Sequence, residues 1–320
     1  MAKQKDPRPL LADGKPIGAE RTDKERQRLL ENFLSPFRVE SGSTVRMPKG
    51  YPTDVKQTLL TKQDGQWLLQ SGTRMLSELQ AKLAAQDRYG LLVVLQAMDA
   101  AGKDGTIRHV MSGVNPQGVR VESFKIPSAE ELNHDYLWRY ARRLPARGEI
   151  GIFNRSHYEE VLVVRVHPEL LQRQHLPDAA TGKGIWKHRF REINDWERYL
   201  SDNGIRIVKI FLHVSKEEQA RRLLKRIDDS ARNWKFSPSD MHERDYWKDY
   251  QEAYAEVLSH TSTPWAPWYV IPADTKWFAR VGAAALIVQT LLDIGPTYPK
   301  AAPEVVDELP HFRDELAATA

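Results

Sequence analysis

A glycine–lysine pair, Gly102 and Lys103, stands where a buried strand is expected to end and a helix to begin. Residues 91–95 are all Leu or Val, which is typical of a parallel strand buried on both faces. A strand, a tight loop and a helix in this order are the setting of a Walker A loop, whose backbone N–H groups and lysine bind phosphate. The predicted phosphate-binding residues of this loop are Ala100, Ala101, Gly102, Lys103, Asp104 and Gly105.

Two residues depart from the usual pattern of such a loop. Ala97 stands where the first glycine is usual, and Asp104 stands where a Ser or Thr hydroxyl normally ligates Mg²⁺. Asp99, inside the loop, is a second carboxylate, and two carboxylates beside a phosphate chain require a divalent metal to neutralise them. We therefore predict that Asp99 and Asp104 bind metal. The alternative is an ordinary strand-to-helix turn with an incidental lysine.

The next expected strand, 149–153, leads into a second polar segment. Ligands of open α/β sheets bind at the carboxyl ends of strands, so this segment should lie beside the loop. Arg155 suits a phosphoryl group in transfer because its guanidinium is planar and always charged, and Glu159 suits a metal or the acceptor. The alternatives are a surface ion pair for Arg155 and a helix-terminal charge for Glu159, while His157 is expected to be structural. The predicted catalytic residues are Asp99, Lys103, Arg155 and Glu159, and Glu159 joins Asp99 and Asp104 as a predicted metal ligand.

A third basic cluster lies on an expected helix at 216–227. Arg222 and Arg226 are four residues apart and therefore share one helix face. We interpret about 220–258 as a lid that closes over phosphate groups, with Arg222, Arg226 and Lys235 as phosphate ligands. The alternative is an exposed basic helix.

The chain between the first two sites holds candidates for binding a nucleotide acceptor. In a P-loop kinase this region usually shapes the acceptor pocket, and its arginines suit the acceptor's phosphates. Ordinary surface charge is the alternative for these arginines. The predicted nucleotide-binding residues are Asn115, Arg120, Phe124, Arg139, Asn154 and Arg155.

The elements that must position these residues alternate along the chain. Apolar spacing and Gly or Pro boundaries predict strands that are separated by helices, which implies a mainly parallel sheet covered by helices on both faces. We expect strands at 91–95, 118–124, 149–153, 205–214 and 268–271, and helices at 66–86, 106–112, 129–143, 186–201, 216–227, 238–258 and 277–292.

Composition narrows the class of protein. A chain with 41% hydrophobic and 28% charged residues can bury a core, and the absence of cysteine excludes disulfides, thiolate metal sites and a cysteine nucleophile. It also suits a cytoplasmic location. No apolar run is expected to span a membrane, and the N-terminus lacks a secretory signal. We divide the chain into a flexible arm at 1–36, with one short helix near 24–33, a kinase domain at 37–293, and a loosely ordered tail at 294–320.

Six segments occur in a characteristic order: QAMDAAGKDG (96–105), GVNP (113–116), DYLWR (135–139), FNRSHYE (153–159), RNWKF (232–236) and APWYVIPA (266–273). Over about residues 37–292 the chain thereby resembles the polyphosphate kinase 2 family. The six segments together are highly specific for this family, whereas the loop alone would not be.

This resemblance implies a thymidylate-kinase-like P-loop fold, which is a three-layer α/β fold with a mainly parallel sheet and a helical lid. It implies dependence on Mg²⁺, with Mn²⁺ as an alternative, metal binding by Asp99, phosphate contacts from Lys103 and Arg155, and lid arginines at Arg222 and Arg226. The family usually has Asp followed by Arg-Ser-Trp-Tyr-Asn at the second site. The segment here, with Asn154, His157 and Glu159, resembles the class III subgroup, which accepts both AMP and ADP.

The predicted activity is reversible, Mg²⁺-dependent transfer of the terminal phosphoryl group of inorganic polyphosphate to ADP and AMP, which forms ATP and ADP. Guanine nucleotides are alternative acceptors. The resemblance implies a homodimer or homotetramer, and we expect neither nucleic acid nor membrane as partner. The alternative functions are an ATP-dependent nucleoside or nucleotide kinase, which the unusual Ala97 and Asp104 disfavour, and a non-catalytic P-loop module that binds nucleic acid through its basic helices.

Overall fold

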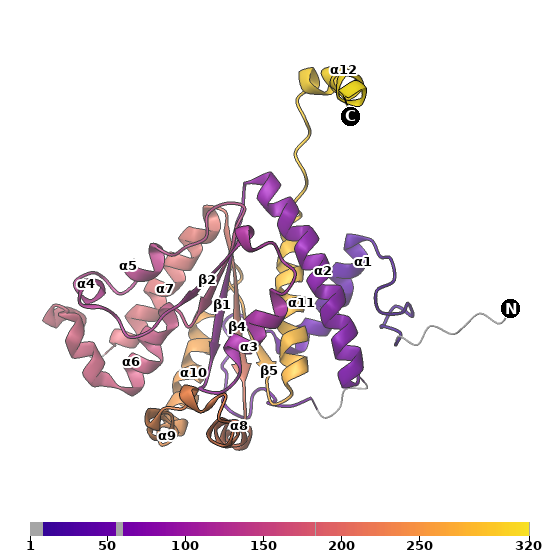
Figure 1. The fold of residues 1–320 in the computed structure, drawn as a ribbon. Helices are drawn as coiled ribbons and strands as arrows, with labels where there is room; N and C mark the ends of the chain where they lie inside the picture. Colours follow the sequence, from indigo (N-terminus) through magenta and orange to yellow (C-terminus); the bar gives the residue numbers. More distant parts are fainter. Residues whose placement is uncertain (1–8, 56–59, 183, 320) are drawn as a thin grey trace.

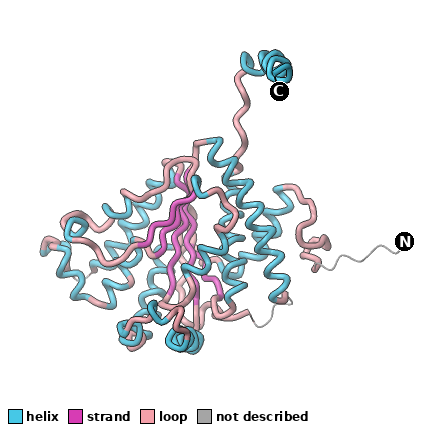
Figure 2. Tube along the Cα trace, viewed as in Figure 1, coloured by secondary structure: helices cyan, strands magenta, loops and turns pink. Residues whose placement is uncertain are grey.

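A five-stranded parallel sheet forms the centre of the protein in the computed structural model, which describes residues 9–55, 60–182 and 184–319. The strand order is β2-β3-β1-β4-β5, and all four neighbouring pairs are parallel. Figure 1 shows the sheet nearly edge-on between two layers of helices, and Figure 2 shows the strands gathered in the middle of the molecule. The strands are β1 (Gly90–Ala97), β2 (Val119–Ser123), β3 (Ile150–Asn154), β4 (Ile205–His213) and β5 (Trp268–Pro272).

The register of the central strands brings the first two predicted sites together. Leu95 of β1 pairs with Asn154 of β3 and with Ile210 of β4, so β1 and β3 reach the same sheet edge side by side. Every residue of β1 is buried, which explains the unbroken apolar run at residues 91–95. The loop after β1 and the segment after β3 are therefore neighbours.

Helices cover both faces of the sheet, as the alternation of elements predicts (Figure 1). The first layer holds α1 (Asp23–Leu34), α2 (Lys62–Gln86), α3 (Lys103–Val110) and α11 (Lys276–Ile294), with α11 in contact with the other three. The opposite layer holds α6 (Val163–Val166), α7 (Ile185–Asp202) and α10 (Trp247–Thr261), and α10 contacts the other two. The remaining helices are α4 (Ala129–Leu132), α5 (Trp138–Ala141), α8 (Lys216–Asp228), α9 (Pro238–Glu243) and α12 (Pro303–Thr319), and the 3-10 helices are η1 (Ser35–Phe37), η2 (Pro116–Gly118), η3 (His157–Val161), η4 (Pro168–Gln174), η5 (Asp178–Ala180) and η6 (Asn233–Lys235).

The helix α11 qualifies the expectation that no segment could span a membrane. Its 19 residues have a mean hydropathy of 1.4 in the most apolar stretch, which is long and apolar enough by those two measures. However, 67% of that stretch is buried in the protein, where α11 packs against α2, α3 and the strands β4 and β5. Its apolar side chains thus serve the core.

Two long helices of the sequence prediction are wrong because each is divided. The predicted helix at 129–143 becomes α4 and α5, since the Asp135 carboxylate accepts from the N–H of Leu137 and stabilises a turn between them. The predicted helix at 238–258 becomes α9 and α10. Arg244, between these two helices, donates to the Lys216 carbonyl and to Gln219 of α8, so a tertiary contact holds the turn.

The two ends of the chain also differ from their predictions. Residues 1–8 lie outside the described residues, but α1 has a capping box from Thr22 and Glu25 and packs against α11 with Leu34 buried. This part of the predicted flexible arm therefore belongs to the packed fold. The tail, predicted as loosely ordered, contains the helix α12, none of whose residues is buried. The division of the chain into arm, kinase domain and tail stays a prediction.

Candidate active site

The loop between β1 and α3 bends so that the helix begins at its lysine. Gly102 is the N-cap of α3 with φ of +109°, and Ala100 has φ of +58°, so two left-handed residues reverse the chain within three positions. Lys103 is the first residue of α3, and its Nζ donates to the Ala97 carbonyl at 2.9 Å. Backbone N–H groups at such a helix start are unpaired within the helix and suit a phosphate oxygen.

Arg155 lies between two carboxylates at this sheet edge. Its Nη2 is 3.1 Å from Asp99 Oδ1 of the loop, and its Nη1 is 3.6 Å from Glu159 Oε2. Arg155 itself has φ of +63°, an uncommon conformation for a residue with a Cβ. Glu159 and Asp99 raise the pKa of Arg155 against the effect of burial. The guanidinium is thus a fixed positive charge with one edge toward each acid.

Lys103 faces the same group of charges. Burial lowers the pKa of Lys103, and the positive charge of Arg155 lowers it further, while Asp99, Glu159 and Asp104 raise it. Each of these five residues was predicted from the sequence, and the structure brings all five to one sheet edge. Two cations and three acids in one place suit a polyanion that arrives with a divalent metal.

Asp104 and Asn154 join the two strand ends directly. Asn154 Nδ2 donates to Asp104 Oδ1 at 2.8 Å and lies 3.4 Å from Ser123 Oγ at the end of β2. Asn154 therefore orients the Asp104 carboxylate, which remains exposed to solvent. Across the part of the chain that the structure describes, no three metal-ligating side chains form a cluster. Magnesium is commonly held by one or two carboxylates plus substrate phosphates, so the acids here fit a metal that is bound together with substrate.

Arg222 joins the loop between β1 and α3 to the segment after β5. All three nitrogens of its guanidinium donate hydrogen bonds, and its side chain is only 7% exposed. Four of its five acceptors are backbone carbonyls, two from the loop and two from the segment after β5. The acceptors are the backbone oxygens of Ala100, Ala101, Ala273 and Asp274 and the carboxylate of Glu218. In this structure Arg222 holds the loop in place, whereas the sequence predicted that it contacts phosphate.

Arg226 and Lys235 lie farther along the predicted lid. Arg226 Nη1 is 3.5 Å from Asp240 Oδ2 of α9, so α8 and α9 are joined by this ion pair. Burial raises the pKa of Asp240, and the nearby charge of Asp99 raises it further, which places α9 close to the loop. Lys235, in η6, is exposed, and its Nζ lies 5.0 Å from the centre of the Trp234 ring. In Figure 1, α8 and α9 lie together at the lower end of the sheet.

Comparisons with known proteins agree with this arrangement. A sequence model of the family described as Polyphosphate kinase 2 matches residues 59–296. The chain belongs to the polyphosphate kinase 2 family. It is therefore an enzyme that transfers phosphate from polyphosphate to nucleotides.

Individual relatives of the polyphosphate kinase 2 family match most of the chain. An ADP-polyphosphate phosphotransferase of Rhodopseudomonas palustris is 50% identical over 281 residues, which cover 88% of this chain and 97% of that protein. An AMP/ADP-polyphosphate phosphotransferase of Meiothermus ruber is 44% identical over 275 residues, covering 86% and 98%. The crystal structure of Polyphosphate Kinase 2 from Arthrobacter aurescens TC1 is 38% identical, covers 87% of this chain and 98% of its own, and superposes with a TM-score of 0.75.

The four remaining predicted nucleotide-binding residues lie near the two ends of β2 and not in the loop itself. Asn115 caps η2 by accepting from the N–H of Gln117, and Arg120 is near the start of β2, 3.6 Å from Glu149. Both lie toward the amino edge of the sheet, because α3 runs back from the loop before β2 begins. The other two, Phe124 and Arg139, are buried against each other, with the Arg139 guanidinium 5.4 Å from the Phe124 ring.

Sequence reasoning missed three side chains that support the site of this polyphosphate kinase 2 member. Gln219 Nε2 donates to the Asp99 carbonyl at 3.0 Å, and its Oε1 accepts from Arg244. Gln219 lies three residues before Arg222, so the helical face of the arginines could have indicated it. Tyr254 of α10 is buried, and its pKa is raised by burial and by Glu159 and Asp99. Nothing in the sequence around Tyr254 signals this position.

A second ionic cluster lies in the core and confirms the structural reading of His157. Glu197 of α7 is fully buried and interacts with Lys209 Nζ at 2.6 Å, Tyr158 Oη at 2.8 Å and His157 Nε2 at 3.2 Å. Lys209 also donates to the Thr261 carbonyl at 2.6 Å. Burial alone would raise the pKa of Glu197, but Lys209 and His157 keep it below its ordinary value. This cluster holds α7 and β4 together and faces no solvent.

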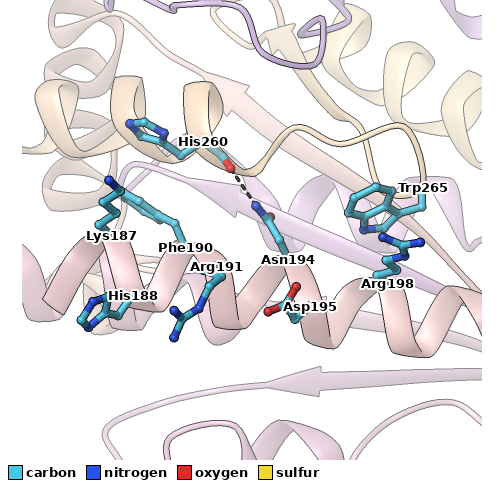
Figure 3. A pocket seen from close by; sticks show the side chains of 9 residues that line it. All are labelled: Lys187, His188, Phe190, Arg191, Asn194, Asp195, Arg198, His260 and Trp265. Carbon is cyan, nitrogen blue, oxygen red and sulfur yellow. Dashed lines mark hydrogen bonds between the residues drawn. The ribbon is translucent and has the colours of Figure 1, made fainter. Parts of the chain in front are cut away.

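Two cavities of the described chain lie away from the predicted site residues. A groove of about 590 Å³ runs along α7 beside the end of α10, where Asn194 Nδ2 donates to the His260 carbonyl at 2.8 Å (Figure 3). Another cavity, of about 860 Å³, lies between the N-terminal segment, α2 and α11. None of the residues predicted to bind phosphate, nucleotide or metal lines either of them. The candidate active site is therefore the sheet edge around Lys103 and Arg155.

Proposed function

We propose that this chain transfers the terminal phosphoryl group of inorganic polyphosphate to ADP and to AMP, forming ATP and ADP, in a reversible reaction that requires Mg²⁺. Both directions are expected because one phosphoanhydride bond replaces another. The donor and the acceptor meet at the carboxyl edge of β1 and β3. Guanine nucleotides are alternative acceptors, and Mn²⁺ is an alternative metal.

The observation that carries this proposal is the convergence of Lys103 and Arg155 with the acids Asp99 and Glu159. The distances of 3.1 and 3.6 Å from Arg155 to the two acids place one planar cation across the loop and the second strand end. A polyphosphate end brings several negative charges to this place. Lys103 and Arg155 neutralise charge on the transferring group, and the start of α3 contributes backbone N–H donors.

A divalent metal fits the carboxylates of this edge. Asp99 and Asp104 would hold it, with Glu159 as a third candidate, and phosphate oxygens would complete its ligands. Bound there, Mg²⁺ supplies positive charge that neutralises the phosphate chain. The hydrogen bond from Asn154 keeps the Asp104 carboxylate directed toward the end of β3.

No general base is required at this site. The attacking oxygen of AMP or ADP is already ionised at neutral pH, so positioning and charge stabilisation account for the catalysis. Arg222 contributes by binding the carbonyls of Ala100 and Ala101, which fixes the conformation of the loop. We assign Arg222 as a positioning residue, and Arg226 as the lid cation that exchanges Asp240 for phosphate.

The names of two relatives support the choice of both AMP and ADP as acceptors. The relative from Meiothermus ruber is named for AMP and ADP, and the one from Rhodopseudomonas palustris for ADP. The Glu159 carboxylate, 3.6 Å from Arg155, would add an oxygen ligand for a divalent metal at this edge.

The test uses purified full-length chain with Mg²⁺ and separates nucleotides by chromatography. Reactions contain polyphosphate or ATP as donor and AMP, ADP or GDP as acceptor. The expected result is ATP from ADP, and ADP followed by ATP from AMP, with polyphosphate alone as donor. Product formation only with ATP as donor would overturn the proposal, and product from ADP but not AMP would remove AMP from it.

We also propose that the enzyme acts in the cytoplasm as a homodimer or homotetramer, without nucleic acid or membrane as partner. The absence of cysteine supports a reducing compartment. The burial of α11 supports a role for that helix in the core. Salt-dependent gel shifts with RNA and DNA test the nucleic-acid part, and retardation at physiological salt would contradict it.

A further inference from the structure

The C-terminal helix α12 (Pro303–Thr319) is unlike every other long helix of the described chain. None of its residues is buried, and it extends from the body beyond the end of α11 (Figure 1). It also lies outside residues 59–296, which the polyphosphate kinase 2 family model matches. A helix with apolar side chains and no packing partner normally gains its stability from another surface.

Four large apolar residues of α12 form one stripe, and a fifth, Val306, lies beside it next to Val305. Val305, Leu309, Phe312 and Leu316 are separated by four, three and four residues, which is the a/d spacing of a two-stranded coiled coil. Their exposed fractions are 50%, 52%, 47% and 69%. Scattered exposed apolar residues need no explanation, but a regular stripe on a helix of 17 residues indicates an interface.

The charged residues beside this stripe favour a second copy of the same helix as the partner. With Val305 and Phe312 at d and Leu309 and Leu316 at a, Glu308 takes a g position and Arg313 the following e position. Parallel coiled coils pair g of one helix with the next e of the other, so Glu308 would meet Arg313 of a second copy twice across the dimer. An antiparallel pair would instead bring Glu308 toward Glu315, another g residue, and the two acids would repel.

The remaining features of α12 agree with this pairing. Pro310 lies at b, on the face away from the stripe, so its missing N–H and its ring do not enter the interface. Within the described part of the chain neither Glu308 nor Arg313 forms a salt bridge, so both are available. The polar face carries mostly acids, namely Glu304, Asp307, Glu308, Asp314 and Glu315, which disfavours an anionic membrane as partner.

We propose that α12 is an assembly helix that pairs in parallel with α12 of a second copy of this chain. Residues 295–302 connect it to α11 and, when extended, reach about 26 Å, so two bodies can lie side by side at one end of the pair. α11 ends at the amino edge of the sheet, opposite the phosphate loop. The pairing therefore leaves both active sites open, and it is independent of the transfer reaction proposed above.

The absence of cysteine in the natural chain allows a direct test by disulfide trapping in the full-length protein. Leu316→Cys places a thiol at the proposed parallel interface, where it faces its own counterpart. Asp314→Cys, two residues earlier at an f position on the outer face, is the matched control. Mild oxidation should convert most of the Leu316→Cys protein to a covalent dimer while Asp314→Cys stays largely monomeric on a denaturing gel.

Competing arrangements give different results in this experiment. In an antiparallel pair residue 316 faces Val305, and its two copies are about 16 Å apart along the axis, so no disulfide forms. Docking of α12 onto its own α2–α11 cavity, or onto a different protein, also leaves Leu316→Cys uncrosslinked. Equal crosslinking rates for the two variants overturn the proposal.

Charge exchange tests the parallel orientation separately. Glu308→Arg and Arg313→Glu should each weaken dimerisation about tenfold in sedimentation equilibrium, because each places like charges across two symmetric contacts. The double variant should restore the dimer. Phosphotransfer per chain should remain unchanged in all three, which separates failure of this proposal from failure of the catalytic one. Weakening in the double variant equal to the sum of the single variants contradicts the pairing.

Discussion

One short segment of this protein contributes to two ionic clusters, and the two clusters differ in their exposure to solvent. Arg155 and Glu159 point to the sheet edge, where the Arg155 side chain is 43% exposed and pairs with Asp99. His157, between them in sequence, points into the core and joins Glu197 and Lys209, which are 0% exposed. Neighbouring side chains of residues 154–161 thus lie in opposite environments, some at the solvent-exposed sheet edge and some in the core.

The difference shows why one cluster suits catalysis and the other suits architecture. Exposed ion pairs contribute at most about 1 kcal/mol, so Arg155 can exchange a carboxylate for phosphate at little cost to stability. Removing one partner of a buried ion pair costs far more stability, because the other charge is left without water or a counter-ion. Variants at the edge should therefore change activity, and variants in the core should change stability.

The largest effect is expected at Lys103. Lys103→Ala removes the charge at the start of α3, and kcat/KM should fall about 10³-fold or more, since preorganised charge is the main source of catalysis in phosphoryl transfer. Among the described residues the Lys103 side chain donates one hydrogen bond, to the Ala97 carbonyl, so the unfolding free energy should change by less than about 1 kcal/mol. Steady-state kinetics and urea unfolding measure the two quantities.

The matched control is Lys248→Ala, which removes a lysine that is 88% exposed on α10. It should retain full activity. If Lys103→Ala keeps more than a tenth of the wild-type kcat/KM, the loop is not the phosphate site.

The core cluster should give the reverse pattern. Lys209→Met leaves Glu197 charged and buried, and we expect a loss of about 3–5 kcal/mol in unfolding free energy. The activity of the folded molecules should stay near normal. The double variant with Glu197→Gln lacks the unpaired buried carboxylate and should recover part of the stability. The idea fails if Lys209→Met lowers activity while the urea midpoint is unchanged.

A pH dependence is expected from the buried histidine at the end of β4. Burial lowers the pKa of His213 to about 4. The unfolded chain binds a proton near pH 6.5, whereas the folded protein does not until about pH 4, so stability is lost as the pH falls through this window. The loss from this one group is about 3 kcal/mol.

Because carboxylates titrate in the same window, the measurement is a comparison of two proteins. Urea unfolding of wild type and His213→Gln at pH 7 and pH 4 should show a smaller loss in the variant, by about 3 kcal/mol. Parallel pH profiles would show that His213 is not the group responsible.

The smallest effect on stability is expected for Arg155→Lys. The variant keeps a positive charge but loses the planar fork that spans Asp99 and Glu159, so activity should fall about 10- to 100-fold. The unfolding free energy should move by less than about 1 kcal/mol. A loss of several kcal/mol would mean that the edge cluster, like the core cluster, holds the fold.

The residues of the loop and second site show what local patterns can predict. Gly102 and Lys103 follow a buried strand with an apolar run at residues 91–95, and Arg155 follows the next central strand, so the rule that ligands bind at strand carboxyl ends indicated both. The family resemblance then supplied the polyphosphate donor. The helices at 66–86, 186–201 and 277–292 were predicted well because their apolar periodicity is long.

Several arrangements that the sequence did not predict depend on contacts between segments distant in sequence. Whether Arg139 faces a nucleotide or packs on Phe124 depends on how α5 meets β2, which no local pattern encodes. The five acceptors of Arg222 come from three separate segments, and Gln219 reaches the Asp99 carbonyl from another strand connection. The break between α9 and α10 similarly depends on Arg244 reaching α8.

From sequence alone came the parallel α/β architecture, the strand-to-helix loop at Gly102 and Lys103, and the placement of Lys103 and Arg155 at one sheet edge, because strand burial, helix starts and strand order each leave a local signature. Tertiary structure alone decided which charged side chains are exposed to solvent and which are buried. Arg155 and His157 differ by two positions, yet one lies at an open sheet edge and the other beneath α7. That outcome depends on packing by segments remote in the chain, and packing determines whether water remains to compensate a charge.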